Sequence, residues 1–137
     1  MTRVQTSQRW RSSSVRRSWG RAIAFFVDVL GFVLSEDTPS RTNDGRPKRW
    51  VVVRPPGGAT GLLLARADGA RQEASIGEQF AGRVGLFLRV DDFAATFARL
   101  QAYGAAIVRP PRDEPYGTVA VFEDCEGNRW DLLGARP

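Results

Sequence analysis

The chain has 137 residues, 42% of them hydrophobic, with 20 Lys and Arg against 15 Asp and Glu, one cysteine and no histidine. This length suits one domain or two small fused repeats. The lone Cys125 excludes an internal disulfide and a cysteine-rich zinc site, and the lack of histidine excludes Ser-His-Asp catalysis, His-zinc hydrolysis and His-ligated haem. No apolar run approaches the ~20 residues of a membrane span, so we expect a cytoplasmic protein with no membrane partner.

The net charge of +5 is concentrated in residues 1–21, which hold six arginines and no acidic residue. The remainder of the chain is almost neutral, with 14 basic and 15 acidic side chains. Trp10 and Trp19 lie among these arginines, a pattern that nucleic-acid-binding proteins also use, but no known binding motif accompanies them. Nucleic acid is therefore not the expected partner.

The basic segment 1–21 admits several interpretations. Its Arg-rich, Ser-rich and acid-free composition suits a transit peptide or a flexible basic tail, and residues 9–16 are the place for an atypical first strand. A fourth interpretation follows from the use of 19 Arg to one Lys, which is typical of a GC-rich gene. Out-of-frame translation of such a gene yields Arg, Ser and Trp, and the coding DNA distinguishes this origin from the others.

The next part of the chain is predicted to form a helix and three strands. Apolar residues recur at helical spacing in RAIAFFVDVLGF and predict a helix at about 20–30, with Gly31 as its C-terminal cap. Three strands follow, at 32–34, 49–53 and 61–67. Between the first two, SEDTPSRTNDGRP (35–47) is expected to be irregular because it is rich in Pro, Asn, Asp and Gly.

A polar connector, 68–82, leads to a second group of elements. A strand at 83–90 precedes a helix that Asp91 or Asp92 caps and Gly104 ends. The apolar face of this helix consists of Phe93, Phe97, Leu100 and Tyr103. Three more strands are expected at 105–110, 116–124 and 128–134. The two groups match as an internal duplication of a βαβββ unit, if the first strand of the first copy lies within the basic segment.

Three stretches resemble the vicinal-oxygen-chelate superfamily, which includes glyoxalase I, bleomycin-resistance proteins and extradiol dioxygenases. They are AIAFFVDVLGF, VDDFAATFARLQAYGA and PYGTVAVFEDCEGNRWDLL. The resemblance covers residues 22–134. Its most specific part is the last hairpin, where Asp124, Gly127 and Asn128 are residue types that tight turns favour.

The resemblance implies an α+β fold in which two βαβββ modules form a curled, open-barrel mixed sheet with a cleft and helices outside, commonly within a homodimer. On this basis the chain divides into a basic tail (1–8), a first module with an atypical first strand (9–67), a connector (68–82) and a second module (83–134). Together these segments make one glyoxalase-like domain.

The resemblance also implies four metal-ligand positions, one on the first strand and one on the last strand of each module. Asp131 occupies one of them with a carboxylate, whereas Leu63 and Gly85 occupy two others, and the fourth falls near Arg11. A single carboxylate holds a catalytic metal poorly. We therefore expect no metal and no other cofactor.

What remains is a cleft for a small-molecule ligand. Strand alternation sends Arg129 and Asp131 to one side, and Gly85, Phe87 and Arg89 share that side if Asp131 faces the cleft. The expected ligand-binding residues are Trp50, Leu63, Gly85, Phe87, Arg89, Tyr116, Arg129 and Asp131. Two alternatives stay open: Phe87 and Trp130 belong to the core, or Asp131 simply pairs with Arg129 or Arg89.

Two classes of function follow, and a third is weaker. The first is a bleomycin-resistance-like protein that binds a small hydrophobic or planar molecule without a catalytic metal. The second is a metal-dependent lyase, isomerase or dioxygenase of the same superfamily, with Asp131 as the candidate catalytic base and Tyr116 as an acid. Cys125 is expected to be inert because Asp124 and Glu126 disfavour a thiolate. The third is nucleic-acid binding through the basic segment.

Overall fold

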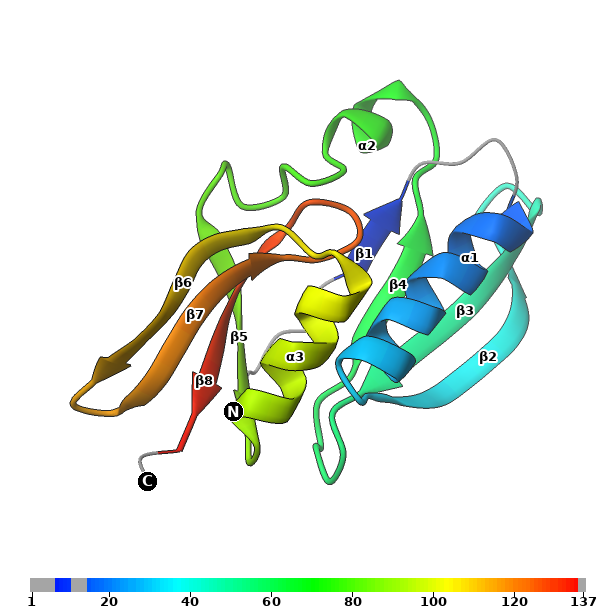
Figure 1. The fold of residues 1–137 in the computed structure, drawn as a ribbon. Helices are drawn as coiled ribbons and strands as arrows, with labels where there is room; N and C mark the ends of the chain where they lie inside the picture. Colours follow the sequence, from blue (N-terminus) through cyan, green and yellow to red (C-terminus); the bar gives the residue numbers. More distant parts are fainter. Residues whose placement is uncertain (1–6, 11–14, 136–137) are drawn as a thin grey trace.

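The computed structural model describes residues 7–10 and 15–135, and it confirms an α+β fold with two βαβββ modules (Figure 1). The first module consists of β1 (Ser7–Trp10), α1 (Val15–Ala24) with its π-helical continuation η1 (Phe25–Val29), β2 (Val33–Arg41), β3 (Pro47–Arg54) and β4 (Leu62–Arg66). After the short α2 (Ala70–Ala74), the second consists of β5 (Val84–Val90), α3 (Phe93–Tyr103), β6 (Ile107–Glu114), β7 (Gly117–Glu123) and β8 (Arg129–Gly134).

Each module contributes one four-stranded mixed sheet, and the two sheets have equivalent strand orders. Sheet one has the order β1-β4-β3-β2 and sheet two the order β5-β8-β7-β6. In each, the first strand pairs with the last in parallel, and the other pairs are antiparallel. Figure 1 shows α1 and α3 on the same side of the two sheets. Each sheet thus has a helix face, which packs on a helix, and an open face on the opposite side.

The hydrophobic core lies between the helices and the helix faces. The five apolar residues that recur at helical spacing in the predicted 20–30 helix are buried, namely Ala22, Phe25, Phe26, Val29 and Leu30. On α3, Leu100 is buried, Phe93 and Phe97 stack on each other and pack against the core, and Tyr103 contacts the ring of Phe25. The helical periodicity therefore located both core-facing surfaces.

The ends of α3 follow the predicted capping chemistry. Asp92 is the N-cap, and its carboxylate accepts a hydrogen bond of 3.0 Å from the backbone N–H of Ala95. Gly104 adopts the left-handed conformation, with φ of 85°, that ends many helices. Within the described ranges, no helix is both long and apolar enough to cross a membrane.

The first module departs from the predicted boundaries at its start. The first strand is β1, at Ser7–Trp10, rather than at about 9–16, and the helix begins at Val15 rather than near residue 20. The start of the strand and of the helix could not be predicted, because the arginine-rich sequence has no apolar periodicity. Residues 1–6, the greater part of the predicted tail, and residues 11–14 lie outside the described residues.

The stretch 35–47 was wrongly predicted to be irregular, since β2 runs through it to Arg41. This strand lies at the edge of sheet one and most of its residues are exposed, so it shows no alternation of apolar and polar side chains. Pro39 is compatible with an edge strand, where a missing N–H costs no sheet hydrogen bond. Only the turn from Thr42 to Arg46 is irregular.

Side-chain hydrogen bonds and aromatic contacts join the two modules. Arg99 of α3 donates a hydrogen bond of 2.9 Å from Nε to the carbonyl of Val29 in η1. Arg21 of α1 donates one of 2.8 Å to the carbonyl of Cys125, in the β7–β8 turn. Aromatic rings complete the junction, with Trp130 of β8 next to Phe26 and Phe32 of the first module.

Candidate functional site: the open face of sheet two

The open face of sheet two is built from two rows of side chains that cross all four strands. Residues directly opposite each other in a sheet project from the same face. The first row, from β5 to β6, is Phe87, Asp131, Val121 and Arg109. The second row is Arg89, Leu133, Val119 and Arg112. The face therefore has an apolar floor on the two central strands and arginines at both edges.

Exposure differs between the floor and the edges of this face. Val119 and Val121 are buried, whereas the arginines of both rows are exposed. Phe87 is 48% exposed although it is an aromatic residue on a strand. The alternative that Phe87 belongs to the core is thus not what the structure shows.

Asp131 is half-buried in the first row, between Phe87 and Val121. Burial raises the pKa of its carboxyl group above the usual value, and attraction by Arg112 and Arg109 partly opposes this rise. The arginines that act on Asp131 therefore come from β6. They are not Arg129 or Arg89, the two partners that strand alternation offered.

Arg129 and Arg89 lie elsewhere on the same sheet. The guanidinium of Arg129 donates to the carbonyl of Gly82 at 3.2 Å and lies 3.6 Å from the carboxylate of Glu123. Arg89 is opposite Leu133, one step along the sheet from Asp131. Among the described residues, neither guanidinium forms an ion pair with Asp131.

Tyr116 is 56% exposed in the turn between β6 and β7. It lies close enough to Arg112 to influence the pKa of that guanidinium, which its ion pair with Glu114 raises most. Tyr116 therefore lies near the Arg112 end of the second row.

Gly85, one of the positions that the metal pattern singled out, has no room for a side chain. A Cβ atom at Gly85 would overlap the ring of Phe80, which packs directly on the glycine. Because this ring fills the space, a metal ligand at this position would displace it. The connector thus supplies a contact that sequence reasoning did not anticipate.

Sheet one presents a different open face. Leu63 stands opposite Val52, as Asp131 stands opposite Val121, which makes Leu63 the counterpart of Asp131. Trp50 is 40% exposed, and its indole N–H donates a hydrogen bond of 2.6 Å to Glu36. The predicted site residues are therefore distributed over two open faces, with Trp50 and Leu63 on sheet one.

Register also shows how the first strands correspond. Ser7 pairs with Leu63 as Phe87 pairs with Asp131, so Ser7 corresponds to Phe87. Arg11, which sequence reasoning placed near the first-strand ligand position of module one, lies outside the described residues.

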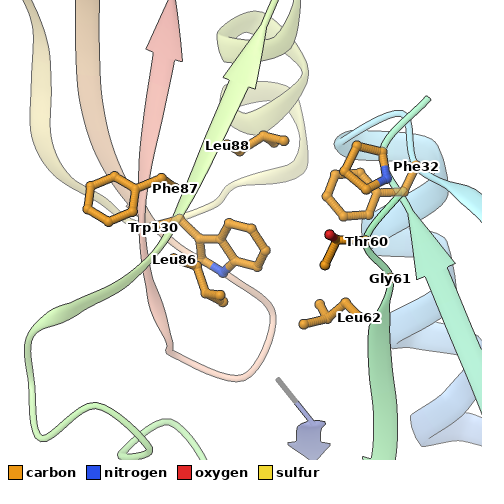
Figure 2. Close-up of a pocket in the computed structure, with 9 residues that line it drawn as sticks. Phe32, Thr60, Gly61, Leu62, Leu86, Phe87, Leu88 and Trp130 are labelled. Carbon is orange, nitrogen blue, oxygen red and sulfur yellow. The ribbon is translucent and has the colours of Figure 1, made fainter. Parts of the chain in front are cut away.

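A mainly apolar hollow separates the two modules where β4 begins beside β5 (Figure 2). Its walls are Phe32, Pro55, Thr60, Gly61, Leu62, Leu86, Phe87, Leu88 and Trp130. Leu62, Leu86 and Trp130 are buried residues of the two helix faces. The hollow is therefore continuous with the core, and Phe87 is the one predicted site residue that lines it.

The residues present do not fit a bound metal. Within 7–10 and 15–135, no three His, Cys, Asp or Glu side chains gather around a common point. Leu63 offers no donor atom, and Phe80 covers Gly85. Asp131 alone matches the expected ligand pattern.

Two other ionisable residues, Asp124 and Cys125, lie in the β7–β8 turn and have structural roles or are unreactive. Asp124 is buried and accepts hydrogen bonds from the backbone N–H groups of Glu126 and Asn128 and from the indole N–H of Trp130. These contacts hold the β7–β8 turn. Burial, assisted by the charges of Asp124 and Glu126, raises the pKa of the Cys125 thiol, so this thiol is a poor nucleophile.

Sequence reasoning missed the arginines of β6. Arg109 and Arg112 share the open face although they are three residues apart, because register shifts interrupt the β6–β7 pairing on both sides of Arg109. Simple alternation places residues three apart on opposite faces. The one sequence signal was the pair of prolines between them, which is unusual within a regular strand.

The family model and the similar solved structures point to the same superfamily. The model of the Glyoxalase/Bleomycin resistance protein/Dioxygenase superfamily matches residues 15–132. An uncharacterised protein of Shewanella frigidimarina (strain NCIMB 400) is 52% identical over 120 residues, which are 87% of each chain.

Two solved structures from Streptomyces sp. CB03234 are similar to this chain in sequence as well as in fold. TnmS3, described as an antibiotic binding protein, is 32% identical with a TM-score of 0.67, over 98% of this chain and 97% of its own. A glyoxalase/bleomycin resistance protein is 30% identical with a TM-score of 0.62, over 95% of this chain and 99% of its own.

Proposed function

Since the chain belongs to the Glyoxalase/Bleomycin resistance protein/Dioxygenase superfamily, we propose that it binds a small planar or amphipathic organic molecule without a catalytic metal. The observation that carries this proposal is the exposed Phe87 next to the half-buried Asp131, beside an apolar floor. Aromatic surface with a few fixed polar groups is the usual lining of a small-molecule site.

The composition of the face favours a planar ligand. An exposed phenylalanine offers a flat apolar surface on which a ring can stack, and such contacts add about 0.5–1.5 kcal/mol to the burial of apolar area. The name of TnmS3 as an antibiotic binding protein supports the same class of activity.

Binding without a metal is supported by the donor set. Three of the family's ligand positions can be located here, and Leu63 and Gly85 supply no ligand at two of them. We therefore assign Asp131 to contact with the ligand itself, as an acceptor for a hydroxyl or amine hydrogen. A metal-dependent lyase, isomerase or dioxygenase is the alternative that the experiment below separates from binding.

A homodimer is part of the proposal. The open faces of both sheets lie on the side away from α1 and α3, so the open faces point the same way instead of enclosing a ligand between them (Figure 1). A second copy placed against them would exclude water from Phe87 and Trp50. Sedimentation analysis should give twice the chain mass, and a monomer at micromolar concentration would contradict this part.

The binding test uses tryptophan fluorescence of the purified protein, titrated in chelator-treated buffer with a panel of planar polycyclic compounds. We expect saturable quenching that excess EDTA does not change. Phe87→Ala should weaken binding about tenfold, because it removes the stacking surface. Trp50→Phe identifies the contribution of the exposed indole to the signal. Absence of saturation with every compound would contradict binding, and loss of binding in EDTA would favour the metal-dependent alternative.

A further inference from the structure

The geometry of the open face of sheet two points to a more specific ligand, and this inference rests on the proposed function. We infer that the ligand is an aromatic acid, whose ring stacks on the exposed Phe87 and whose anionic group is received by Arg109. Carboxylate, sulfonate and phenolate groups share the required chemistry, because each can accept hydrogen bonds from a guanidinium.

Ion pairing within the face leaves Arg109 available. The guanidinium of Arg112 donates to Glu114 at 2.8 Å, and that of Arg129 lies 3.6 Å from Glu123. Among the described residues, no carboxylate lies within ion-pair distance of Arg109. Register places Arg109 in the first row with Asp131, and its charge lowers the pKa of that carboxyl group.

The spacing along the first row fits an extended planar molecule. Neighbouring strands lie about 4.8 Å apart, so Phe87 and Arg109 are separated by about 14 Å at their Cα atoms. Arg109 pairs with Val121, and an arginine side chain is long enough to shorten this span. A fused two- or three-ring system with one acidic substituent covers the remaining distance.

Sheet one carries the opposite charge at the equivalent place. Glu36 stands opposite Val52 as Arg109 stands opposite Val121, so the two residues occupy corresponding positions. Glu36 is already engaged by the indole of Trp50. An acidic ligand is therefore attracted to sheet two and repelled by the matching position on sheet one.

The test compares two fluorescent probes with the same ring system. 8-Anilinonaphthalene-1-sulfonate carries a sulfonate, and N-phenyl-1-naphthylamine is its neutral counterpart. We expect the sulfonate to bind about tenfold more tightly, the effect of one charge-assisted contact. Arg109→Gln should remove most of this difference and leave the neutral probe unchanged. Arg71→Gln removes an equal charge on the exposed surface of α2 and serves as the control.

The outcomes distinguish a failure of the aromatic-acid inference from a failure of small-molecule binding itself. Equal affinity for the two probes in the wild type, or an equal loss in Arg109→Gln and Arg71→Gln, overturns the aromatic-acid inference and leaves small-molecule binding intact. Failure of both probes and of the wider panel overturns the proposed function and the inference with it. Thermal melts of the variants, together with a stoichiometry of one probe per site, establish that the probes report the folded site.

Discussion

The two modules have the same strand pairing but different side chains on both faces of their sheets. On the helix faces, Phe122 and Trp130 in sheet two correspond by register to Val53 and Leu62 in sheet one. On the open faces, Asp131 corresponds to Leu63. Backbone pairing thus survives large changes in side-chain volume and charge, provided that apolar residues stay on the helix face. Side chains on the open face can therefore differ in chemistry. At this position sheet two has the ionisable Asp131, whereas sheet one has the apolar Leu63.

The largest expected difference between the modules concerns the helix faces. Trp130→Ala should lower the free energy of unfolding by about 3–5 kcal/mol, because it leaves a cavity between the modules. It also removes the indole donor that Asp124 uses. Leu62→Ala, the register-matched control, should cost at least about 1 kcal/mol less, since it breaks no hydrogen bond. Denaturant unfolding measures both, and equal losses would show that Trp130 has no special role at the junction.

A smaller effect is expected where the connector covers sheet two. Gly85→Ala should destabilise the protein by about 1–3 kcal/mol, because the added methyl group displaces the ring of Phe80. Gly20→Ala is the matched control, since no atom lies near its Cβ position in the exposed part of α1, and it should stabilise by up to about 1 kcal/mol. Melting curves compare the two variants. A neutral Gly85→Ala would mean that the position can accept a side chain, including a metal ligand.

The smallest effect concerns the pH dependence of Asp131. Its folded pKa lies above the unfolded value of 3.8, so the folded state binds more protons in the interval between them. Stability contributed by this group therefore falls as the pH rises through that interval. As the pH rises from about 3 to about 7, the stability of Asp131→Asn should increase relative to that of the wild type. The stability of Leu63→Asn in sheet one should show no such change with pH. A variant difference that is flat with pH would show that burial does not perturb this carboxyl group.

Local sequence patterns predicted much of the fold. Helical spacing located the buried residues of 20–30 and Leu100 of α3, and cap chemistry located Asp92 and Gly104. These features depend on neighbours within one or two turns, so the sequence carries them directly. The start of module one and the edge strand β2 escaped prediction because pairing with β4 and β3, not side-chain periodicity, sets their structure.

For the candidate site, the sequence by itself determined which residue types are absent and that Asp131 lies on the last strand. It lacks histidine, has one cysteine, and places Asp131 on an alternating strand. Only the tertiary structure decided what surrounds Asp131, because Phe87, Val121 and Arg109 come from three other strands and meet through register. Register shifts in β6 brought Arg109 and Arg112 to one face, against simple alternation. Such a row depends on hydrogen bonds between distant segments, which local residue patterns do not specify.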